Sequence, residues 1–496
     1  MKIDAKTVSY KDIYHAILRD EKILLDKKVI SLLHKQRERL ESLLDREIPM
    51  YGVNTGFGAL KSHAISRDNI HKLQENLILS HAVGVGNPFS PEIVKTVMLL
   101  IILYLSKGFS GVRPKVIETI LKMVNKNVIP VVPEKGSVGA SGDLSPSSHI
   151  ALVVTGKGEA YYDGTKMNGK NAMQKAGISP ITLAEKEGLA LINNTATMTA
   201  NAVFALAESL YLSDIADMSA ALSIEALRAT HKAFDQRLHA LKPYDGQIYV
   251  AEYLRRVLLG STMQDKKRIQ DQYSLRCVPQ VHGAIREAIT FVEKIINTEI
   301  NSVTDNPVLF SSGRGAVDIV SGGNFHGEAV AIAMDALRLS VCELANISDR
   351  RICSLLDANH NFGLPAFLAK NPGVNSGMMV LQYTTAALVS ENKILAHPAV
   401  VDSIPTCANI EDHVSMGTIS ARKTREVIDN VKHVLAIELL TSCQAIDFRL
   451  QEGYSLAGGT DKIYKKIRKT VPFFDADCEY TPYIKKIVEM IEEEKL

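Results

Sequence analysis

The most regular feature of the sequence is a series of long apolar stretches in its second half. They are rich in Ala, Leu, Ile and Glu and hold no internal proline and almost no glycine, so each is predicted to form one long α-helix. Between residues 328 and 345 only four side chains are charged, and a helix that apolar is expected inside a bundle or against another subunit. The stretches are residues 199–231, 282–299, 327–356, 375–396 and 414–448.

The first part of the chain has a mixed pattern. Helical patches at residues 69–80 and 93–107 are interrupted by glycine-rich turns at residues 51–58 and 136–142. The alternation of Gly, Tyr, Asp and Lys over residues 156–170 predicts a short surface hairpin.

These patterns predict a mainly α protein with two regions. Residues 1–195 are expected to form an N-terminal, mixed but mostly helical catalytic region, and residues 196–496 a bundle of long helices with substrate-binding loops. The most apolar run, residues 97–105, is too short to cross a bilayer and is predicted to be a buried helix.

Composition and charge narrow the function classes. Of 496 residues, 46% are hydrophobic and 23% are charged, which suits a protein with a large core. The net charge is +2 and neither sign is concentrated in a tail or stripe, so neither nucleic acid nor a membrane is expected as a partner. The six cysteines form no CxxC pair, and no apolar run stands near Met1. Reduced thiols, no signal peptide and a cytoplasmic location are therefore expected.

The segment with the most unusual chemistry is the small-residue loop at residues 136–146. Taken alone it is a glycine-rich turn before a helix near residues 148–154, and it lacks the spacing of a phosphate-binding loop. However, its Ala140-Ser141-Gly142 sequence can cyclise, because no side chain on Gly142 hinders attack of its nitrogen on the Ala140 carbonyl. Loss of water from the ring and from Ser141 then leaves an electrophilic alkene, with Asp143 placed to assist proton transfers.

Several motifs in order make the chain resemble the ammonia-lyases and aminomutases that act on aromatic amino acids through a methylidene-imidazolone (MIO) group. The resemblance implies a helical fold of the fumarase/aspartase type, an MIO made from Ala140, Ser141 and Gly142, no external cofactor and no metal. It also implies a homotetramer with shared active sites. The motifs lie at residues 51–58, 80–86, 139–144, 187–193, 270–277, 304–307, 322–326 and 411–417.

The same resemblance implies roles for single residues. Tyr51 is the candidate base, although a tyrosine needs a positive or hydrogen-bonding environment to act near neutral pH. Tyr273 and Gln270, three residues apart, are expected to share a helical turn near the tripeptide. Arg276 offers a planar fork for the substrate carboxylate. The implied catalytic residues are Tyr51, Tyr273, Glu411 and the tripeptide, and the implied substrate-binding residues are His81, Asn193, Gln270, Arg276 and Phe325.

Two positions favour an imidazole-bearing substrate. Glu411 and His81 can recognise an imidazole N–H, whereas a phenyl ring would leave them unpaired. The expected reaction is therefore non-oxidative elimination of ammonia from L-histidine to give trans-urocanate. Three departures from the resembled pattern, at Asn194, Ile410 and residues 145–148, bear on the substrate more than on the MIO.

Three alternatives remain open from the sequence. The nearest is an ammonia-lyase for tyrosine or phenylalanine, or an aminomutase that adds the ammonia back. A helical scaffold without activity is a second alternative. A metal enzyme is a third, since His326-Gly327-Glu328 has the H-x-E spacing of zinc deaminases, but the partner PCxxC sequence is missing.

Overall fold

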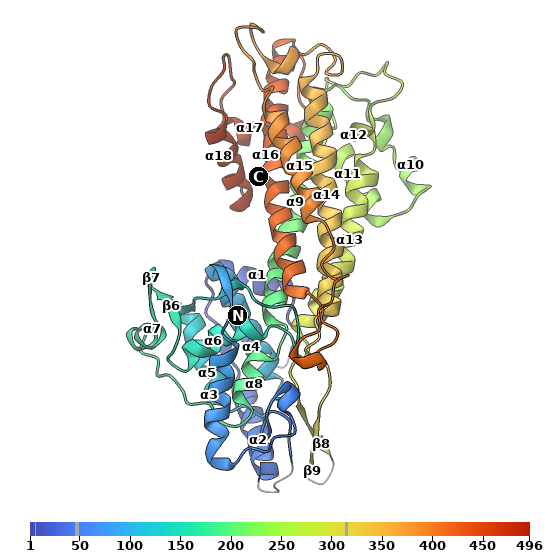
Figure 1. The fold of residues 1–496 in the computed structure, drawn as a ribbon. Helices are drawn as coiled ribbons and strands as arrows, with labels where there is room; N and C mark the ends of the chain where they lie inside the picture. The colour runs from blue at the N-terminus through green and yellow to red at the C-terminus, as the bar shows by residue number, and fades with distance from the viewer. Residues whose placement is uncertain (5, 45–48, 313–315) are drawn as a thin grey trace. The chain divides into compact units, whose positions relative to one another are not determined.

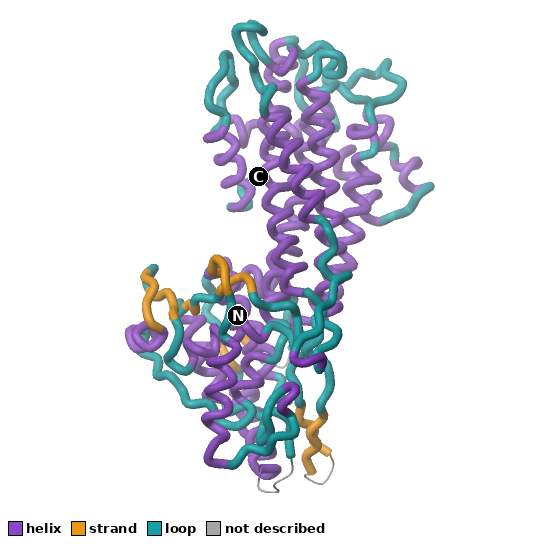
Figure 2. The backbone as a smooth tube through the Cα atoms, in the orientation of Figure 1, coloured by secondary structure: helices purple, strands orange, loops and turns teal. Residues whose placement is uncertain are grey.

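The computed structural model describes residues 1–4, 6–44, 49–312 and 316–496. Within them the chain forms two compact units assembled from interleaved segments. Unit 1 comprises Met1–Ala207, Glu293–Asp335 and Pro398–Arg422, and unit 2 comprises Glu208–Val292, Ala336–His397 and Lys423–Leu496. Helices dominate both units, and the strands are short (Figure 2).

Unit 1 consists mainly of short and medium helices together with short strands, of which β6 to β9 are labelled in Figure 1. Its helices are α1 (Tyr10–Leu18), α2 (Lys27–Leu44), α3 (Ile70–His81), α4 (Pro91–Ser106), α5 (Pro114–Asn125), α6 (Leu144–Val154), α7 (Gly169–Lys175), α8 (Glu187–Ile192) and parts of four long helices given below. Its strands are β1 (Lys2–Ile3), β2 (Leu24–Leu25), β3 (Val85–Pro88), β4 (Ile129–Pro130), β5 (Pro133–Lys135), β6 (Glu159–Tyr162), β7 (Thr165–Asn168), β8 (Val308–Ser312) and β9 (Ala316–Val320).

The strand pairs are local. Strands β6 and β7 form the hairpin expected at residues 156–170, and β4 adds to it antiparallel through Ile129 and Pro130. Strands β8 and β9 form a second antiparallel hairpin, β3 pairs antiparallel with β5, and β1 pairs parallel with β2.

Helix α4 supplies the centre of the unit 1 core. Pro91 stands in its first turn, where the missing N–H costs nothing, and residues 93–106 are all buried. This confirms the buried helix predicted from the apolar run at residues 97–105. Helices α3, α6 and α8 pack against one another, and this packing fixes the loops that enter and leave them.

Unit 2 holds most of the long helices. They are α9 (Ala196–Ala226), α13 (Val278–Ile300), α14 (Glu328–Leu356), α15 (Leu381–Leu395) and α16 (Gly417–Gln451), of which all but α15 contain a unit boundary. Shorter elements are α10 (Gln236–Ala240), α11 (Asp245–Val257), α12 (Tyr273–Arg276), α17 (Gly458–Arg468) and α18 (Thr481–Glu492), and single-turn helices occur at His231–Phe234 and Ala366–Leu368. The long-helix prediction is confirmed for α9, α13, α14 and α16, whereas the stretch expected at residues 375–396 is helical only over Leu381–Leu395. The expected boundary at residues 195–196 stays a prediction, although α9 begins at Ala196.

A fully buried ion pair lies in the core of unit 2. Arg351 donates to both carboxylate oxygens of Glu438, and Ser219, Ser223 and Ser348 donate to the same carboxylate. Burial alone would raise the pKa of Glu438, but the Arg351 charge and these hydrogen bonds hold it below its ordinary value.

The structure also bears on the expectations about membranes and thiols. Among the described residues, no helix combines the length and the apolar character needed to cross a membrane. All six cysteines lie within the described ranges and are free thiols.

Candidate active site

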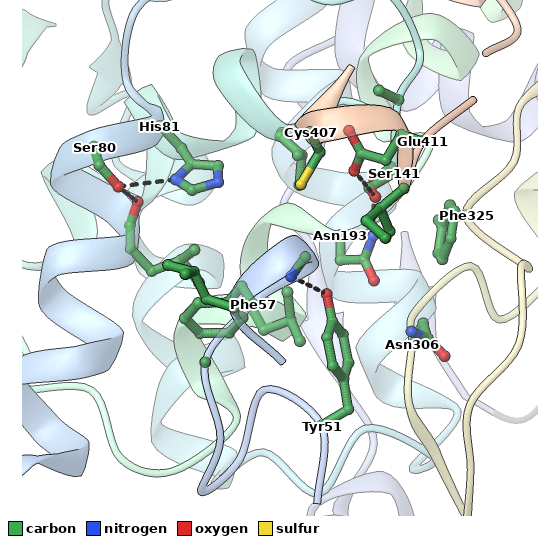
Figure 3. Close-up of a pocket in the computed structure, with 18 of the residues that line it drawn as sticks. Tyr51, Phe57, Ser80, His81, Ser141, Asn193, Asn306, Phe325, Cys407 and Glu411 are labelled. Carbon is green, nitrogen blue, oxygen red and sulfur yellow. Dashed lines mark hydrogen bonds between the residues drawn. The ribbon is translucent and has the colours of Figure 1, made fainter. Parts of the chain in front are cut away.

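Unit 1 contains a cavity of about 790 Å³ that is walled by loops and by the ends of helices. Its residues come from the 51–65 turn region, from α3, from the loop before α6, from the end of α8, and from two later segments, 306–326 and 407–413. Figure 3 shows Tyr51, His81, Ser141, Asn193 and Glu411 around this space. Segments distant in the sequence therefore meet where the motifs predicted a site.

The Ala140-Ser141-Gly142 loop has a tight left-handed backbone at the cavity wall. Ser141 has φ +50° and Gly142 has φ +78°, a region that side chains disfavour. A Cβ atom on Gly142 would lie 2.2 Å from the carbonyl oxygen of Asn194, so only glycine fits there. The Gly142 N–H donates back to the Gly139 carbonyl over 3.3 Å, which shows that the loop folds onto itself.

Two side chains hold Ser141. Its Oγ donates to Oε1 of Glu411 over 2.7 Å, and the Asn193 amide donates to its carbonyl oxygen over 2.7 Å (Figure 3). Glu411 is itself fixed, because Thr406 Oγ1 donates to its other oxygen over 2.8 Å and the two residues form a β-bridge. The hydroxyl and the carbonyl oxygen of Ser141 thus both have hydrogen-bond partners.

Asp143, the residue after the tripeptide, holds the loop through buried hydrogen bonds. Its carboxyl is fully buried and accepts hydrogen bonds from Ser137, from the Met198 N–H and from Thr418. Burial raises the pKa of Asp143, and these donors oppose the rise.

Tyr51 has the hydrogen bond that its proposed role requires, but burial dominates its pKa. Its hydroxyl oxygen accepts the Gly58 N–H over 3.0 Å, which favours the phenolate, but burial outweighs this bond and raises the pKa of Tyr51. The charge of Glu411 raises it further. The hydrogen-bonding environment that a tyrosine base needs is therefore present at Tyr51.

His81 ends α3 at the edge of the cavity. Burial lowers the pKa of His81, partly opposed by the Leu77 carbonyl and the Glu411 charge, so its imidazole is neutral at neutral pH. Its Nδ1 lies 3.0 Å from the hydroxyl of Ser80. Phe325 and Ala140 also line the cavity, as expected.

Three predicted site residues do not line this cavity. Gln270, Tyr273 and Arg276 belong to unit 2. Tyr273 and Arg276 share the single turn of α12, and the Arg276 guanidinium lies 4.6 Å from the Tyr273 ring centroid. Gln270 precedes that helix, so the expectation that Gln270 and Tyr273 share a helical turn is wrong. The Tyr273 side chain is 72% exposed.

The cavity wall includes residues to which the sequence analysis gave no role. Asn306 accepts hydrogen bonds from the Gly322 N–H and from Ser321, so it shapes the loop that carries Phe325. Its position in the 304–307 motif was a usable signal. Cys407 also lines the cavity, but nothing in the sequence distinguished it from the other cysteines.

One cluster beside the cavity could hold a metal ion. His326, Glu328 and His413 offer ligand atoms that all lie within 4.8 Å of one another. The sequence showed the His326–Glu328 spacing, whereas His413 joins them only through the fold. That the enzyme needs no metal stays a prediction.

The fold is mainly helical, and the Ala-Ser-Gly loop lies at the wall of the cavity. The family model described as aromatic amino acid lyase matches residues 8–469. The chain belongs to the aromatic amino acid lyase family.

Several relatives are similar over nearly their whole length. Histidine ammonia-lyase 2 of Fusobacterium nucleatum is 49% identical over 494 residues, which are 99% of this chain and 96% of the relative. Histidine ammonia-lyase of Alkaliphilus oremlandii is 49% identical over 478 residues, which are 96% of this chain and 93% of the relative.

Solved structures agree on the fold. Histidine ammonia-lyase from Trypanosoma cruzi matches with a TM-score of 0.92 and 38% identity, covering 100% of this chain and 93% of that one. Tyrosine aminomutase from Streptomyces globisporus matches with a TM-score of 0.94 and 32% identity, covering 100% and 97%. The predicted mainly helical fold is confirmed.

Proposed function

We propose that this enzyme removes ammonia from L-histidine to give trans-urocanate, using an MIO group made from Ala140, Ser141 and Gly142. The observation that carries the proposal is the hydrogen bond of Glu411 to Ser141, because it joins the candidate imidazole-recognising carboxylate to the candidate electrophile in one cavity. The names of the relatives from Fusobacterium nucleatum and Alkaliphilus oremlandii support the same substrate.

The residues present fit an MIO group. The backbone of Asn194 leaves no room for a side chain on Gly142, and the Asn193 amide already holds the carbonyl oxygen of Ser141. When formed, such a group supplies an electrophilic alkene that withdraws electron density from the substrate while ammonia leaves.

The chain's own side chains recognise the imidazole. Dehydration of Ser141 removes the hydroxyl that donates to Glu411 Oε1, and this oxygen then becomes free to accept an imidazole N–H. His81 is neutral and carries one donor and one acceptor nitrogen, so it can complement the other polar edge of the ring. Phe325 provides an apolar wall for the ring.

Tyr51 is the proposed base for the substrate proton. The Gly58 N–H stabilises its phenolate, which offsets part of the cost of burial. A positioned general base raises the rate by roughly 10²–10⁴, which lowers the activation barrier by about 3–5 kcal/mol. The electrophile must therefore supply much of the remaining reduction of the barrier.

We also propose a homotetramer in which each site draws residues from more than one subunit. Gln270, Tyr273 and Arg276 would join a site in this way. Two observations on unit 2 support this: Tyr273 is 72% exposed, and Arg276 Nε is buried without a hydrogen-bond partner among the described residues. An unpaired buried guanidinium N–H is costly and suits a carboxylate ligand. The cytoplasmic location stays a prediction.

An aminomutase is the second candidate, favoured by the similarity to tyrosine aminomutase. A single assay separates the two: purified protein is incubated with L-histidine, L-tyrosine or L-phenylalanine, while ultraviolet absorbance follows urocanate and chromatography follows β-amino acids. Urocanate from histidine supports the proposal. A β-amino acid, or a product only from tyrosine or phenylalanine, contradicts it.

A further inference from the structure

The segment of Asn193, Asn194 and Thr195 contacts the tripeptide at two points and Asp143, the residue after it, at a third. The Asn193 amide donates to the Ser141 carbonyl, and the Asp143 N–H donates to the Asn194 carbonyl over 2.7 Å. The Asn194 backbone also lies so close to Gly142 that no Cβ atom fits between them. The conformation of the tripeptide therefore depends on where this segment is held.

One buried side-chain contact anchors the segment to a helix far along the chain. The hydroxyl of Thr195, which is fully buried, donates to Oε1 of Glu299 in the last turn of α13. Asn194 adds local bonds, donating to the Leu191 carbonyl over 2.9 Å and accepting the Ala196 N–H over 2.9 Å. These local bonds shape the turn. Ser147 of α6 also donates to Oδ1 of Asn194 over 3.4 Å, and the Thr195–Glu299 bond ties the segment to α13.

We propose that Glu299, acting through Thr195, is a positioning residue for the cyclisation of Ala140-Ser141-Gly142. This proposal rests on the proposed function, because it concerns formation of the same MIO group. Neither residue contacts the reacting atoms in the hydrogen bonds of the structure, so both act through Asn193 and Asn194.

The reaction to be positioned needs no oxidant. The Gly142 nitrogen bonds to the Ala140 carbonyl carbon, and that carbonyl oxygen leaves as water with the amide protons of Gly142 and Ser141. Ser141 then loses its Oγ–H and its α proton as a second water, which leaves a carbon–carbon double bond. The hydrogen bond from Asn193 to the Ser141 carbonyl stabilises the charge that develops as the α proton departs.

Both steps depend on placement. Ring closure needs the Gly142 nitrogen held against the Ala140 carbonyl, and proton loss needs the Asn193 amide on the Ser141 oxygen. A misplacement of about 1 Å costs on the order of 10²-fold in such oriented reactions. Burial raises the pKa of Glu299. Thr195 donates its hydroxyl to Oε1 of Glu299, so this bond requires an acceptor oxygen at that position.

The test measures maturation directly. Each variant is made by cell-free synthesis, and intact mass spectrometry follows the fraction of chains that have lost two waters. Thr195→Val and Glu299→Met remove the donor or the acceptor with little change in size, and both are expected to slow maturation at least tenfold. Thr195→Ser and Glu299→Gln keep the donor or the acceptor and are expected to mature at nearly the wild-type rate.

Thr197→Val is the matched control. Thr197 is equally buried, lies two residues away, and its hydroxyl has no hydrogen-bond partner among the described residues. The substitution should leave the maturation rate unchanged. Circular dichroism on every variant confirms that a slow rate does not arise from misfolding.

The outcomes separate this proposal from the proposed function. If Thr195→Val and Glu299→Met mature like wild type, the positioning role is wrong while the MIO remains. If wild type itself keeps its full mass, the proposed function falls and this proposal with it. Ammonia release per matured chain should change less than the maturation rate, and an equal loss in both would assign the pair to turnover instead.

Discussion

Glu411→Gln is predicted to lower kcat/KM for L-histidine by roughly 10²–10⁴, the range attributed to a general base. The Glu411 carboxylate accepts hydrogen bonds from the hydroxyl groups of Ser141 over 2.7 Å and of Thr406 over 2.8 Å. In the proposed function, loss of the Ser141 hydroxyl leaves one carboxylate oxygen for the imidazole. Glutamine keeps the size of the side chain but removes its charge and its basicity.

The size of the loss distinguishes two roles of Glu411. A hydrogen bond to a charged group contributes about 1.5–3 kcal/mol and one between neutral groups about 0.5–1.5 kcal/mol. If Glu411 only orients the ring, the difference of about 1–1.5 kcal/mol gives roughly a tenfold loss. A loss of 10²–10⁴ requires that Glu411 also takes part in proton transfer.

The assay measures kcat and KM from urocanate absorbance for wild type and variant. Intact mass is needed beside it, because Glu411 also holds Ser141 and a failure to mature would mimic a loss of catalysis. Asp412→Asn is the matched control, since Asp412 is the next residue, lines the same cavity and is exposed. An unchanged kcat/KM in fully matured Glu411→Gln would refute the reasoning and remove the main argument for histidine.

Three further predictions test other parts of the molecule. Ser141→Ala should fold, keep its full mass and be nearly inactive; urocanate formation by an unprocessed variant would contradict the MIO. Arg276→Ala should weaken substrate binding by about 1.5–3 kcal/mol, seen in KM, and Arg276→Lys should recover little because lysine lacks the planar fork. Glu438→Gln should lower the free energy of unfolding by about 3–5 kcal/mol in urea, because it leaves Arg351 buried without its counter-charge. Since the folded pKa of Glu438 lies below its ordinary value of 4.5, wild type should lose this contribution as the pH falls below that value, and a flat stability there would refute the pairing.

The helices were predictable because their signals are local. Proline-free stretches rich in Ala and Leu specified α9, α13, α14 and α16, and the structure differs from the expected bounds only by a few residues at each end. The cavity residues were predictable for another reason, since Tyr51, Ser141 and Glu411 stand in motifs whose order resembles a known family. Neither the helix-forming stretches nor the motifs indicate which side chains form hydrogen bonds with one another.

What the sequence could not supply is the set of long-range polar contacts that fixes the loops. The short α12 illustrates this point: a spacing of three residues suggested one helical turn for Gln270 and Tyr273, yet the helix begins only at Tyr273. The pKa of Tyr51 depends on burial by a fold that no local pattern describes.

The Thr195–Glu299 bond is another long-range polar contact that the sequence does not predict. A buried threonine and a glutamate at a helix end have no periodic sequence pattern. Their proposed role follows only from the structure, in which the Asn194 backbone lies close to Gly142. An Ala-Ser-Gly sequence in a flexible loop would pay the full entropic cost of closing its ring. The proposed self-modification of this loop therefore depends on its rigid surroundings, so variants of Thr195 and Glu299 should impair ring formation although neither residue contacts the tripeptide in the hydrogen bonds of the structure.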